Sequence, residues 1–229
     1  NGKRHLLLVQ DYIEGETYHT LCNQRLKAGK RFSEAEILQL LRQLLPVLEY
    51  IHSMGVIHRD ISPDNIILRN TDQLPVLIDF GSIKEVENKA HSQLIEAIAD
   101  PEGLSLSGTV IGKRGYAPPE QMNQGIVCAH SDLYALAATA VALLTGKQPH
   151  QLIDPQSYQW RWQERVSLSP KLQWLLATML SPKPSDRFSS ATEVINLLQK
   201  MSILPTPAKQ TAPAATVGQS VNRRPPARK

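Results

Sequence analysis

Three oxygen-bearing side chains, Asp60, Asn65 and Asp79, are spaced as metal-assisted phosphoryl transfer requires. The first two belong to the run HRDISPDN (residues 58–65), and the third opens the run DFG (residues 79–81). Mg²⁺ prefers hard oxygen ligands, which a side-chain amide and a carboxylate supply. A separate carboxylate can orient the hydroxyl group that attacks phosphorus. The spacing therefore predicts that Asn65 and Asp79 hold the metal and that Asp60 acts on the acceptor.

Each of these residues also has an ordinary explanation when it is taken alone. Asp and Asn side chains commonly satisfy backbone groups of their own loops. For Asp60 alone, a turn aspartate in a loop that contains a proline is the better interpretation. The joint placement of all three, between two strand-like segments, favours the metal site instead.

The elements that must position these residues are predicted to be mainly helical. A capping-box pattern at 33–36 opens a helix whose apolar residues recur at helical spacing as far as Gly55. Short strand patterns at 56–57 and 75–78 flank the candidate catalytic loop. The other expected elements are a strand at 6–9, helices at 17–28, 131–145, 169–180 and 190–200, and a long surface loop at 82–115 with one helical turn near 93–99.

Composition limits the class of protein. The chain has 229 residues, of which 41% are hydrophobic, so a sizeable core can form. Its two cysteines, Cys22 and Cys128, are too few for a disulfide framework and have no metal-binding spacing. The longest nearly apolar run, 133–144, is shorter than the roughly 20 residues of a membrane span. A cytoplasmic location is expected, with any membrane anchor beyond residue 229.

The net charge of +4 is unevenly distributed. Residues 205–229 hold five basic and no acidic side chains, so the rest of the chain carries about −1. This segment is rich in Pro and Ala and is predicted to be a disordered basic tail. It would act either as a spacer, which we favour, or as a weak contact for acidic surfaces. No basic stripe with interleaved aromatic residues occurs before it, so nucleic-acid binding is not indicated.

Residues 1 to about 200 resemble a eukaryotic-type (Hanks-type) serine/threonine protein kinase of bacteria. The resemblance is carried by HRDISPDN and DFG, and by GYAPPE (115–120), SDLYA (131–135) and SDRF (185–188). It implies a mainly α fold, the C-terminal lobe of a kinase with short β hairpins. The implied domains are a remnant of the N-terminal lobe and hinge at 1–15, the C-terminal lobe at 16–204 and the tail at 205–229.

The resemblance implies that ATP and Mg²⁺ (or Mn²⁺) are the cofactors. Backbone groups of Asp11 and Ile13 would face adenine, Glu14 would lie near the ribose and Ile67 beneath the adenine ring. Gln10 takes the gatekeeper position. An ordinary edge strand and turn would explain residues 8–15 in the absence of the other motifs, and a core isoleucine explains Ile67 almost as well.

Further residues receive structural or regulatory roles from the same resemblance. His58 would pack beneath Phe80, and Gly81 would let the backbone turn after the metal ligand. Arg59 would pair with a phosphate on the 82–115 loop, where Ser92, Ser105, Ser107 and Thr109 are the candidate acceptors. The remaining implied contacts are an ion pair between Glu120 and Arg187, and a bond from Asp132 to the backbone of the catalytic loop.

Two positions depart from the family pattern. Most serine/threonine kinases carry a lysine where this chain has Ser62, and a Gly-Thr pair where it has Gly112 and Lys113. We hypothesise an exchange, in which Lys113 supplies the cation near Asp60 and the γ-phosphate, while Ser62 supplies the hydroxyl. A lysine ammonium is a mobile point charge and can serve from either direction. A solvated loop lysine is the alternative.

The resemblance implies transfer of the ATP γ-phosphate to serine or threonine of protein substrates. No Gly-x-Gly-x-x-Gly loop and no phosphate-gripping strand lysine precede the hinge, so we expect the isolated chain to have negligible activity. A small-molecule phosphotransferase of the aminoglycoside type also uses a His-x-Asp-x-x-x-x-Asn loop, although it lacks the Pro-Pro-Glu segment. A non-catalytic, pseudokinase-like binding module is the other alternative.

Overall fold

The computed structural model describes residues 11–80, 84–85, 113–154, 156–157 and 159–203. Within them the fold is mostly helical, with a small three-stranded antiparallel sheet. The helices are α1 (Tyr18–Lys27), α2 (Glu34–Ser53), α4 (Pro119–Gln124), α5 (Ala129–Thr145), α6 (Pro170–Met179) and α7 (Ala191–Ile203). The strands are β1 (Gly15–Thr17), β2 (Val56–Ile57), β3 (Ile66–Arg69), β4 (Pro75–Leu77) and β5 (Lys84–Glu85).

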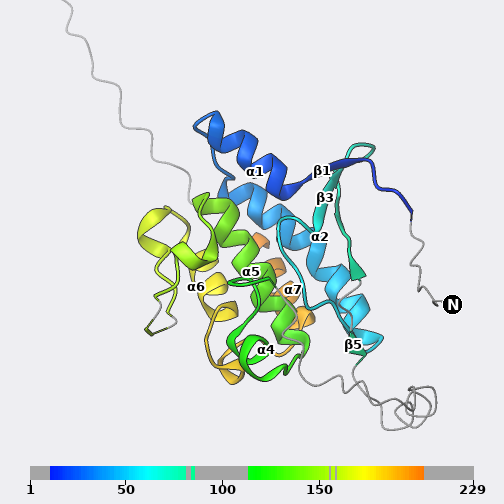
Figure 1. Ribbon diagram of the computed structural model, residues 1–229, viewed down its shortest axis with the longest axis vertical. Coiled ribbons are helices and arrows are strands. Elements are labelled where there is room, and N and C mark those ends of the chain that lie inside the picture. Colours follow the sequence, from blue (N-terminus) through cyan, green and yellow to red (C-terminus); the bar gives the residue numbers. More distant parts are fainter. Residues whose placement is uncertain (1–10, 81–83, 86–112, 155, 158, 204–229) are drawn as a thin grey trace, which may run out of the picture.

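Helix α5 forms the centre of the molecule, and α2 and α6 pack against it (Figure 1). The chain from Ser131 to Thr145 is buried on every side, because its residues are almost all apolar or small. A helix that is hydrophobic all round belongs in a core. This helix can therefore hold a polar side chain rigidly wherever it presents one to the neighbouring loops.

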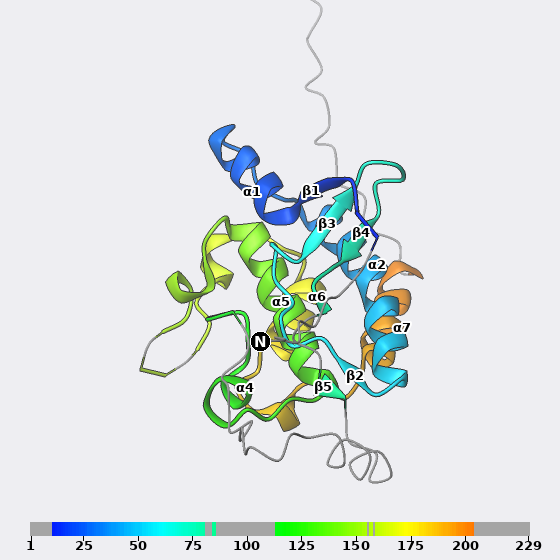
Figure 2. The same cartoon turned by 45° about the vertical axis from the view of Figure 1, so that its right-hand side comes forward.

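Helix α2 presents one apolar face to this core. Its N-terminus is fixed by a capping box, in which the Ser33 hydroxyl accepts from the Glu36 N–H and the Glu36 carboxylate accepts from the Ser33 N–H at 2.8 Å. Buried leucines and isoleucines recur from Ile37 to Ile51, and α7 covers the helix from another side (Figure 2). The helix leads directly into β2 and the candidate catalytic loop.

The three-stranded sheet has the order β1-β3-β4. Ile66 pairs with Leu77 in the antiparallel hairpin of β3 and β4. The residues just outside this pair continue the register, because the Ile78 N–H donates to the Asn65 carbonyl at 2.9 Å. The hairpin therefore brings the end of the catalytic loop beside the segment that carries Asp79.

Several expectations fall on residues outside the described part of the chain. They concern the strand at 6–9, the gatekeeper Gln10, Gly81, most of the 82–115 loop with its phosphate acceptors, and the tail at 205–229. The division into a hinge remnant, a lobe and a tail stays a prediction. Among the described residues, no helix combines the length and apolar character needed to cross a membrane.

Candidate active site

The centre of the site is a pair formed by Asp60 and Asn65 in the loop between β2 and β3. The Asn65 side-chain nitrogen, Nδ2, lies 2.8 Å from the Asp60 carbonyl oxygen and 3.0 Å from its carboxylate Oδ2. Both of those oxygens can only accept, so the amide nitrogen must face them. The Asn65 amide oxygen, Oδ1, is therefore turned away from Asp60 and is available as a hard ligand.

Lys113 reaches the same loop with two groups. Its backbone N–H donates to the Asp60 carboxylate Oδ1 at 3.1 Å. Its ammonium pairs with the carboxylate of Asp64. Among the described residues the ammonium makes no ion pair with Asp60, so the expected charge contact differs from the structure. The Lys113 backbone itself lies against Asp60 Oδ1, and its long side chain extends past that acid to the carboxylate of Asp64.

Asp79 lies just beyond β4, in the turn that follows Ile78. Its φ of 64° places it in the left-handed region, which a non-glycine residue adopts at some cost. Such strained positions cluster at functional sites. The side chain is exposed, and the hairpin register sets its segment beside that of Asn65. The sheet thus sets the segments of the two residues predicted to hold the metal side by side.

These two residues fit a magnesium ion. Mg²⁺ is usually held by one or two carboxylates, with water and substrate phosphates completing its shell. The Asp79 carboxylate and the outward-turned Asn65 oxygen are such a sparse, hard donor set. No group of three or more His, Cys, Asp or Glu side chains suited to a metal occurs in the described part of the chain.

His58 is a structural residue in this arrangement. Its ring packs edge-on against Phe80, with centroids 4.9 Å apart. Its Nδ1 accepts from the Asp60 N–H at 3.3 Å, so Nε2 carries the proton and donates to the Ile78 carbonyl at 3.0 Å. The neutral imidazole thereby connects the catalytic loop to the strand end that precedes Asp79.

Asp132 of helix α5 fixes the start of the catalytic loop through hydrogen bonds to its backbone. Its carboxylate, fully buried, accepts from the backbone N–H groups of His58 and Arg59, each at 2.9 Å, and contacts the Nε2 of His52 at 2.8 Å. These bonds hold Arg59 in the left-handed region at φ 74°. The Gln121 side chain donates to the Arg59 carbonyl at 2.7 Å from the other side.

We expect Asp132→Asn to lower the free energy of unfolding by about 1–3 kcal/mol. The asparagine oxygen can accept from one of the two backbone N–H groups, whereas its NH₂ group faces the other as a second donor. Urea denaturation of the 229-residue chain at neutral pH measures the change. An Asp132→Asn chain as stable as the wild type would show that these bonds do not hold the loop.

Glu120 and Arg187 form a buried, two-pronged ion pair. The guanidinium lies 2.6 and 2.9 Å from the two carboxylate oxygens, and it also donates to the carbonyls of Ser181 and Pro182. Burial works to raise the pKa of Glu120, but the hydrogen bonds from Arg187 and Ser131 outweigh it and leave that pKa lowered. The pair joins the start of α4 to the segment after α6.

The remaining predicted site residues lie at separate places around this centre. Ser62 is buried, and its hydroxyl has no hydrogen-bond partner among the described residues. Ile67 is half-buried on β3, opposite Thr17 of β1. Asp11 and Glu14 are exposed and Ile13 is half-buried, in the stretch before β1. The buried Arg59 Nε has no partner among the described residues, and its expected phosphate lies outside them.

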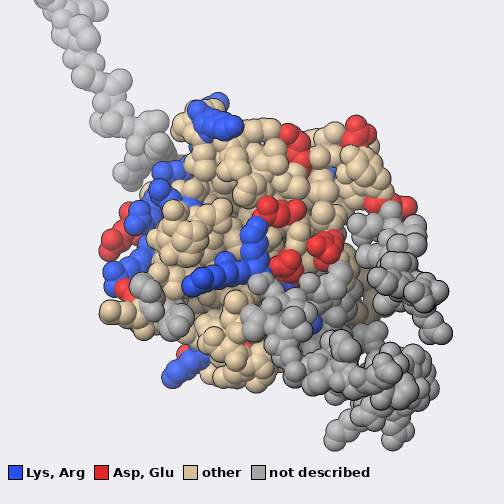
Figure 3. Space-filling view, viewed as in Figure 1, with Lys and Arg blue, Asp and Glu red and all other residues tan. Residues whose placement is uncertain are grey.

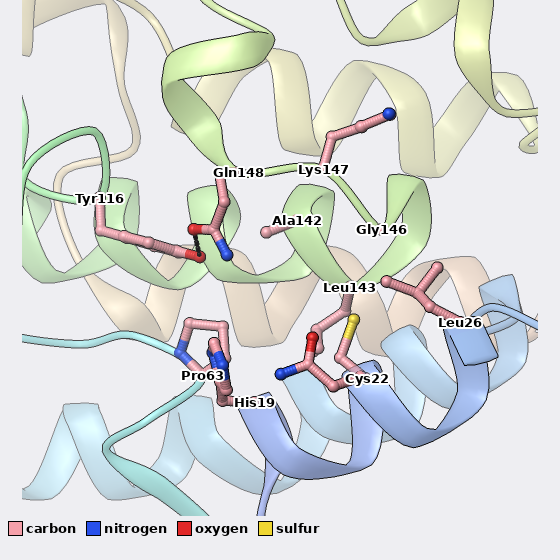
Figure 4. A pocket seen from close by; sticks show the side chains of 11 residues that line it. His19, Cys22, Leu26, Pro63, Tyr116, Ala142, Leu143, Gly146, Lys147 and Gln148 are labelled. Carbon is pink, nitrogen blue, oxygen red and sulfur yellow. Dashed lines mark hydrogen bonds between the residues drawn. The ribbon is translucent and has the colours of Figure 1, made fainter.

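A small pocket borders the catalytic loop (Figure 4). It lies between α1, α5 and the segment of Tyr116, whose hydroxyl is 3.2 Å from the Gln148 side-chain oxygen. Pro63 forms part of its wall. The cavity volume is about 30 Å³, which suits one or two water-sized groups and is far too small for a nucleotide.

One contributor to the site was missed in the sequence. Asp64 binds Lys113 and lies 3.4 Å from the Nδ1 of His19. The sequence shows an acidic residue beside Asn65, but its partners are far away along the chain and no spacing rule pairs them.

The face that carries this loop is mixed in charge: acidic side chains gather near its centre and toward β1, and basic ones over α6 (Figure 3).

A mainly helical fold in which a hairpin sets the Asp79 segment beside a loop with a bonded Asp60–Asn65 pair is the arrangement expected of a phosphotransferase. The sequence model of the protein kinase domain matches residues 1–198. The chain therefore belongs to the protein kinase domain family.

Curated relatives of the chain are serine/threonine kinases by name. The chain is 41% identical over 194 residues to the serine/threonine-protein kinase PknA of Nostoc sp., a match that covers 84% of this chain and 32% of that protein. It is 39% identical over 193 residues to the serine/threonine-protein kinase B of Synechocystis sp., with 84% and 32% covered. Serine/threonine-protein kinase D of the same organism is 38% identical over 215 residues, with 92% and 38% covered. The chain thus spans about a third of the length of these relatives.

Proposed function

We propose that this protein transfers the γ-phosphate of ATP to serine or threonine hydroxyls of protein substrates. The observation that supports the proposal best is the Asp60 carboxylate, which receives one neutral donor on each oxygen, from Asn65 and from the backbone of Lys113. With respect to the described residues, each oxygen keeps a lone pair for an incoming hydroxyl. A fixed carboxylate of this kind can accept the proton of the attacking alcohol.

The nucleotide would bind with its phosphates beside the metal ligands. Asn65 Oδ1 and the Asp79 carboxylate would hold Mg²⁺, which neutralises phosphate charge when it is bound. We further propose that backbone groups of Asp11 and Ile13 contact adenine, that Glu14 lies near the ribose and that Ile67 lies beneath the ring. The buried Ser62 hydroxyl lies in the same loop as Asp60 and Asn65, whereas the Lys113 ammonium is bound by Asp64.

The 229-residue sequence contains no Gly-x-Gly-x-x-Gly loop. In phosphoryl transfer the protein contributes mainly positioning and charge stabilisation, so a missing phosphate cover should cost most of the rate. We therefore propose that the longer protein carries out the transfer. In it, the residues of this chain would orient the acceptor hydroxyl and hold the metal. Substantial transfer from Mg²⁺–ATP to protein by the 229-residue chain alone would contradict this part of the proposal.

A phosphorylation assay of the full-length protein tests the proposed substrate class. We expect phosphate incorporation into serine and threonine of a general protein substrate such as casein, and none into aminoglycosides. The buried Glu120–Arg187 pair supports protein as the substrate class, because the aminoglycoside family lacks the Pro-Pro-Glu segment and the arginine that form it. Transfer to aminoglycosides alone would identify a small-molecule phosphotransferase, and no transfer together with nucleotide binding would identify a binding module.

We expect Mg²⁺–ATP to raise the unfolding temperature of the full-length protein, and Asp79→Asn to remove the magnesium-dependent part of that rise. A ligand at a hundred times its dissociation constant stabilises by about 2.7 kcal/mol. The variant loses a charged ligand of the metal and should respond alike with and without Mg²⁺. Asp72→Asn, an exposed aspartate at the turn of the same hairpin, is the matched control. An unchanged magnesium response in Asp79→Asn would place the metal elsewhere.

A further inference from the structure

A larger cavity lies apart from the active site, between α1, α2 and β3. Its volume is about 180 Å³, which suits one apolar ring, since a cavity of roughly 150 Å³ can bind benzene. The rings of Tyr18 and Phe32 stack in its wall with centroids 5.7 Å apart, and Leu40 and Leu68 complete the apolar part. Neighbouring residues of a strand point to opposite faces of the sheet. Leu68 therefore faces away from the side where Ile67 is proposed to meet adenine.

The mouth of this cavity is polar but carries no net charge. Arg25 pairs with Glu36 at 2.6 Å and lies over the Phe32 ring, so the two opposite charges balance each other. Gln39 and Gln43, one turn apart on α2, add side-chain amides that can donate hydrogen bonds. Such a mouth attracts phosphates and metal ions weakly. It suits a neutral peptide segment that has free backbone carbonyls.

Helix α7 brings the chain back to the end of α2 that lines the cavity. Thr192, in the first turn of α7, donates to the Glu49 carboxylate at 2.5 Å, and α2 ends soon afterwards at Ser53. The two helices lie side by side (Figure 2), so α7 must run back toward the N-terminus of α2. At about 1.5 Å per residue, the rest of α7 covers about 16 Å. Its last residue, Ile203, therefore lies level with the part of α2 that holds Gln39.

The residues that follow α7 suit the cavity in composition and length. The sequence continues as LPTPA (204–208), which contains no charged side chain. Proline has no N–H and favours the polyproline II conformation, in which backbone carbonyls have no internal partners. At about 3.1 Å per residue, five residues span about 15 Å, more than the roughly 10–12 Å diameter of a helix. Gln39 and Gln43 lie roughly a quarter to a third of a turn around α2 from Glu49, so the segment has to cross one helix face only.

We propose that residues 204–208 of this chain dock in the cavity, with a proline ring in its apolar part and backbone carbonyls on the amides of Gln39 and Gln43. Aromatic-lined grooves bind proline-rich segments in the same way, because such segments lose little entropy on binding. The tether to α7 gives the segment an effective concentration in the millimolar range, so a weak contact is sufficient. The inference is independent of the proposed kinase function.

The test measures whether this segment already occupies the cavity in the 229-residue chain. The probe is a fluorescein-labelled peptide of residues 203–210, and its binding is followed by fluorescence anisotropy. The chain with Pro205→Gly/Pro207→Gly should bind the peptide about tenfold more tightly than the wild type, in which the tethered segment competes. A tenfold ratio corresponds to docking for about nine-tenths of the time. Pro225→Gly/Pro226→Gly, further along the same tail, is the matched control and should behave as the wild type.

A second set of variants tests the cavity itself. Gln39→Ala/Gln43→Ala, added to the Pro205→Gly/Pro207→Gly chain, should weaken peptide binding about tenfold, because two hydrogen-bond donors are lost. Alanine is the best helix former, so α2 should stay intact, and unfolding midpoints of all variants check this. Gln124→Ala, at an exposed position of α4, is the matched control and should leave the affinity unchanged.

Three results would overturn the proposal. The first is a peptide that does not bind the Pro205→Gly/Pro207→Gly chain, and the second is a peptide whose affinity does not depend on Gln39 and Gln43. The third is equal binding to this chain and to the wild type, which would show a cavity open to a segment of another protein. Phosphoryl transfer enters none of these measurements, so failure of the proposed function would leave their outcome unchanged.

Discussion

Asp60→Asn is expected to lower kcat of the full-length protein by about 10²–10⁴-fold, the usual contribution of a general base. Asparagine cannot take a proton from the acceptor hydroxyl. It also cannot satisfy both neighbours, since its oxygen can accept from Asn65 only if its NH₂ group faces the donating N–H of Lys113. The substitution therefore removes the proposed base and disturbs the loop that carries Asn65.

The KM for ATP should change far less than kcat in this variant, because the proposed contacts to the nucleotide lie on other residues. Steady-state phosphate incorporation into protein over a range of ATP concentrations separates the two constants. Asp72→Asn serves again as the matched aspartate control, since it lies on the exposed turn of the neighbouring hairpin. A kcat near the wild-type value in Asp60→Asn would show that Asp60 does not act on the acceptor.

The helices could be predicted well because their signals are local. The capping box at Ser33 and the apolar spacing after it predict α2, whose observed range is Glu34–Ser53. The apolar run at 131–145 likewise predicts α5, which begins two residues earlier, at Ala129. Strands β1 and β3 were missed, since three or four residues carry too little pattern and owe their strand state to each other.

The site shows the same contrast between features with a local sequence signal and features that depend on the folded chain. The spacing of Asp60, Asn65 and Asp79 lies within one loop and one hairpin, so its chemistry is visible in the sequence. The destination of the Lys113 ammonium is not visible, because a flexible side chain can reach more than one acid of the same loop. The choice of Asp64 depends on the backbone bond to Asp60, which is a property of the folded chain.

Arg187→Leu is expected to destabilise the 229-residue chain by about 3–5 kcal/mol, the usual effect of removing one partner from a buried ion pair. The leucine leaves the buried Glu120 without its cation and the carbonyls of Ser181 and Pro182 without their donor. It also removes the guanidinium that lies 4.8 Å from the Tyr134 ring centroid. Urea denaturation at neutral pH measures the loss.

Two comparisons separate loss of the ion pair from loss of packing. Glu120→Gln/Arg187→Leu should be more stable than Arg187→Leu alone, because no uncompensated charge stays buried. Arg161→Leu, which breaks the more exposed Arg161–Asp154 pair, should have a much smaller effect. Equal losses in Arg187→Leu and in the double variant would assign the effect to packing.

The stability deficit of Arg187→Leu should also depend on pH in a direction that follows from the pKa of Glu120. In the wild type the pKa of Glu120 is lowered on folding, so its contribution to stability is present above the unfolded pKa and is lost as the pH falls through the folded pKa. Without Arg187, only the weaker hydrogen bonds from Ser131 and the backbone oppose burial, so burial raises that pKa. Protonation of Glu120 then reduces the loss of stability in the variant as the pH falls. The stability deficit of Arg187→Leu should therefore shrink from neutral to acidic pH, and a deficit that grows toward acid would show that the buried charge is not its cause.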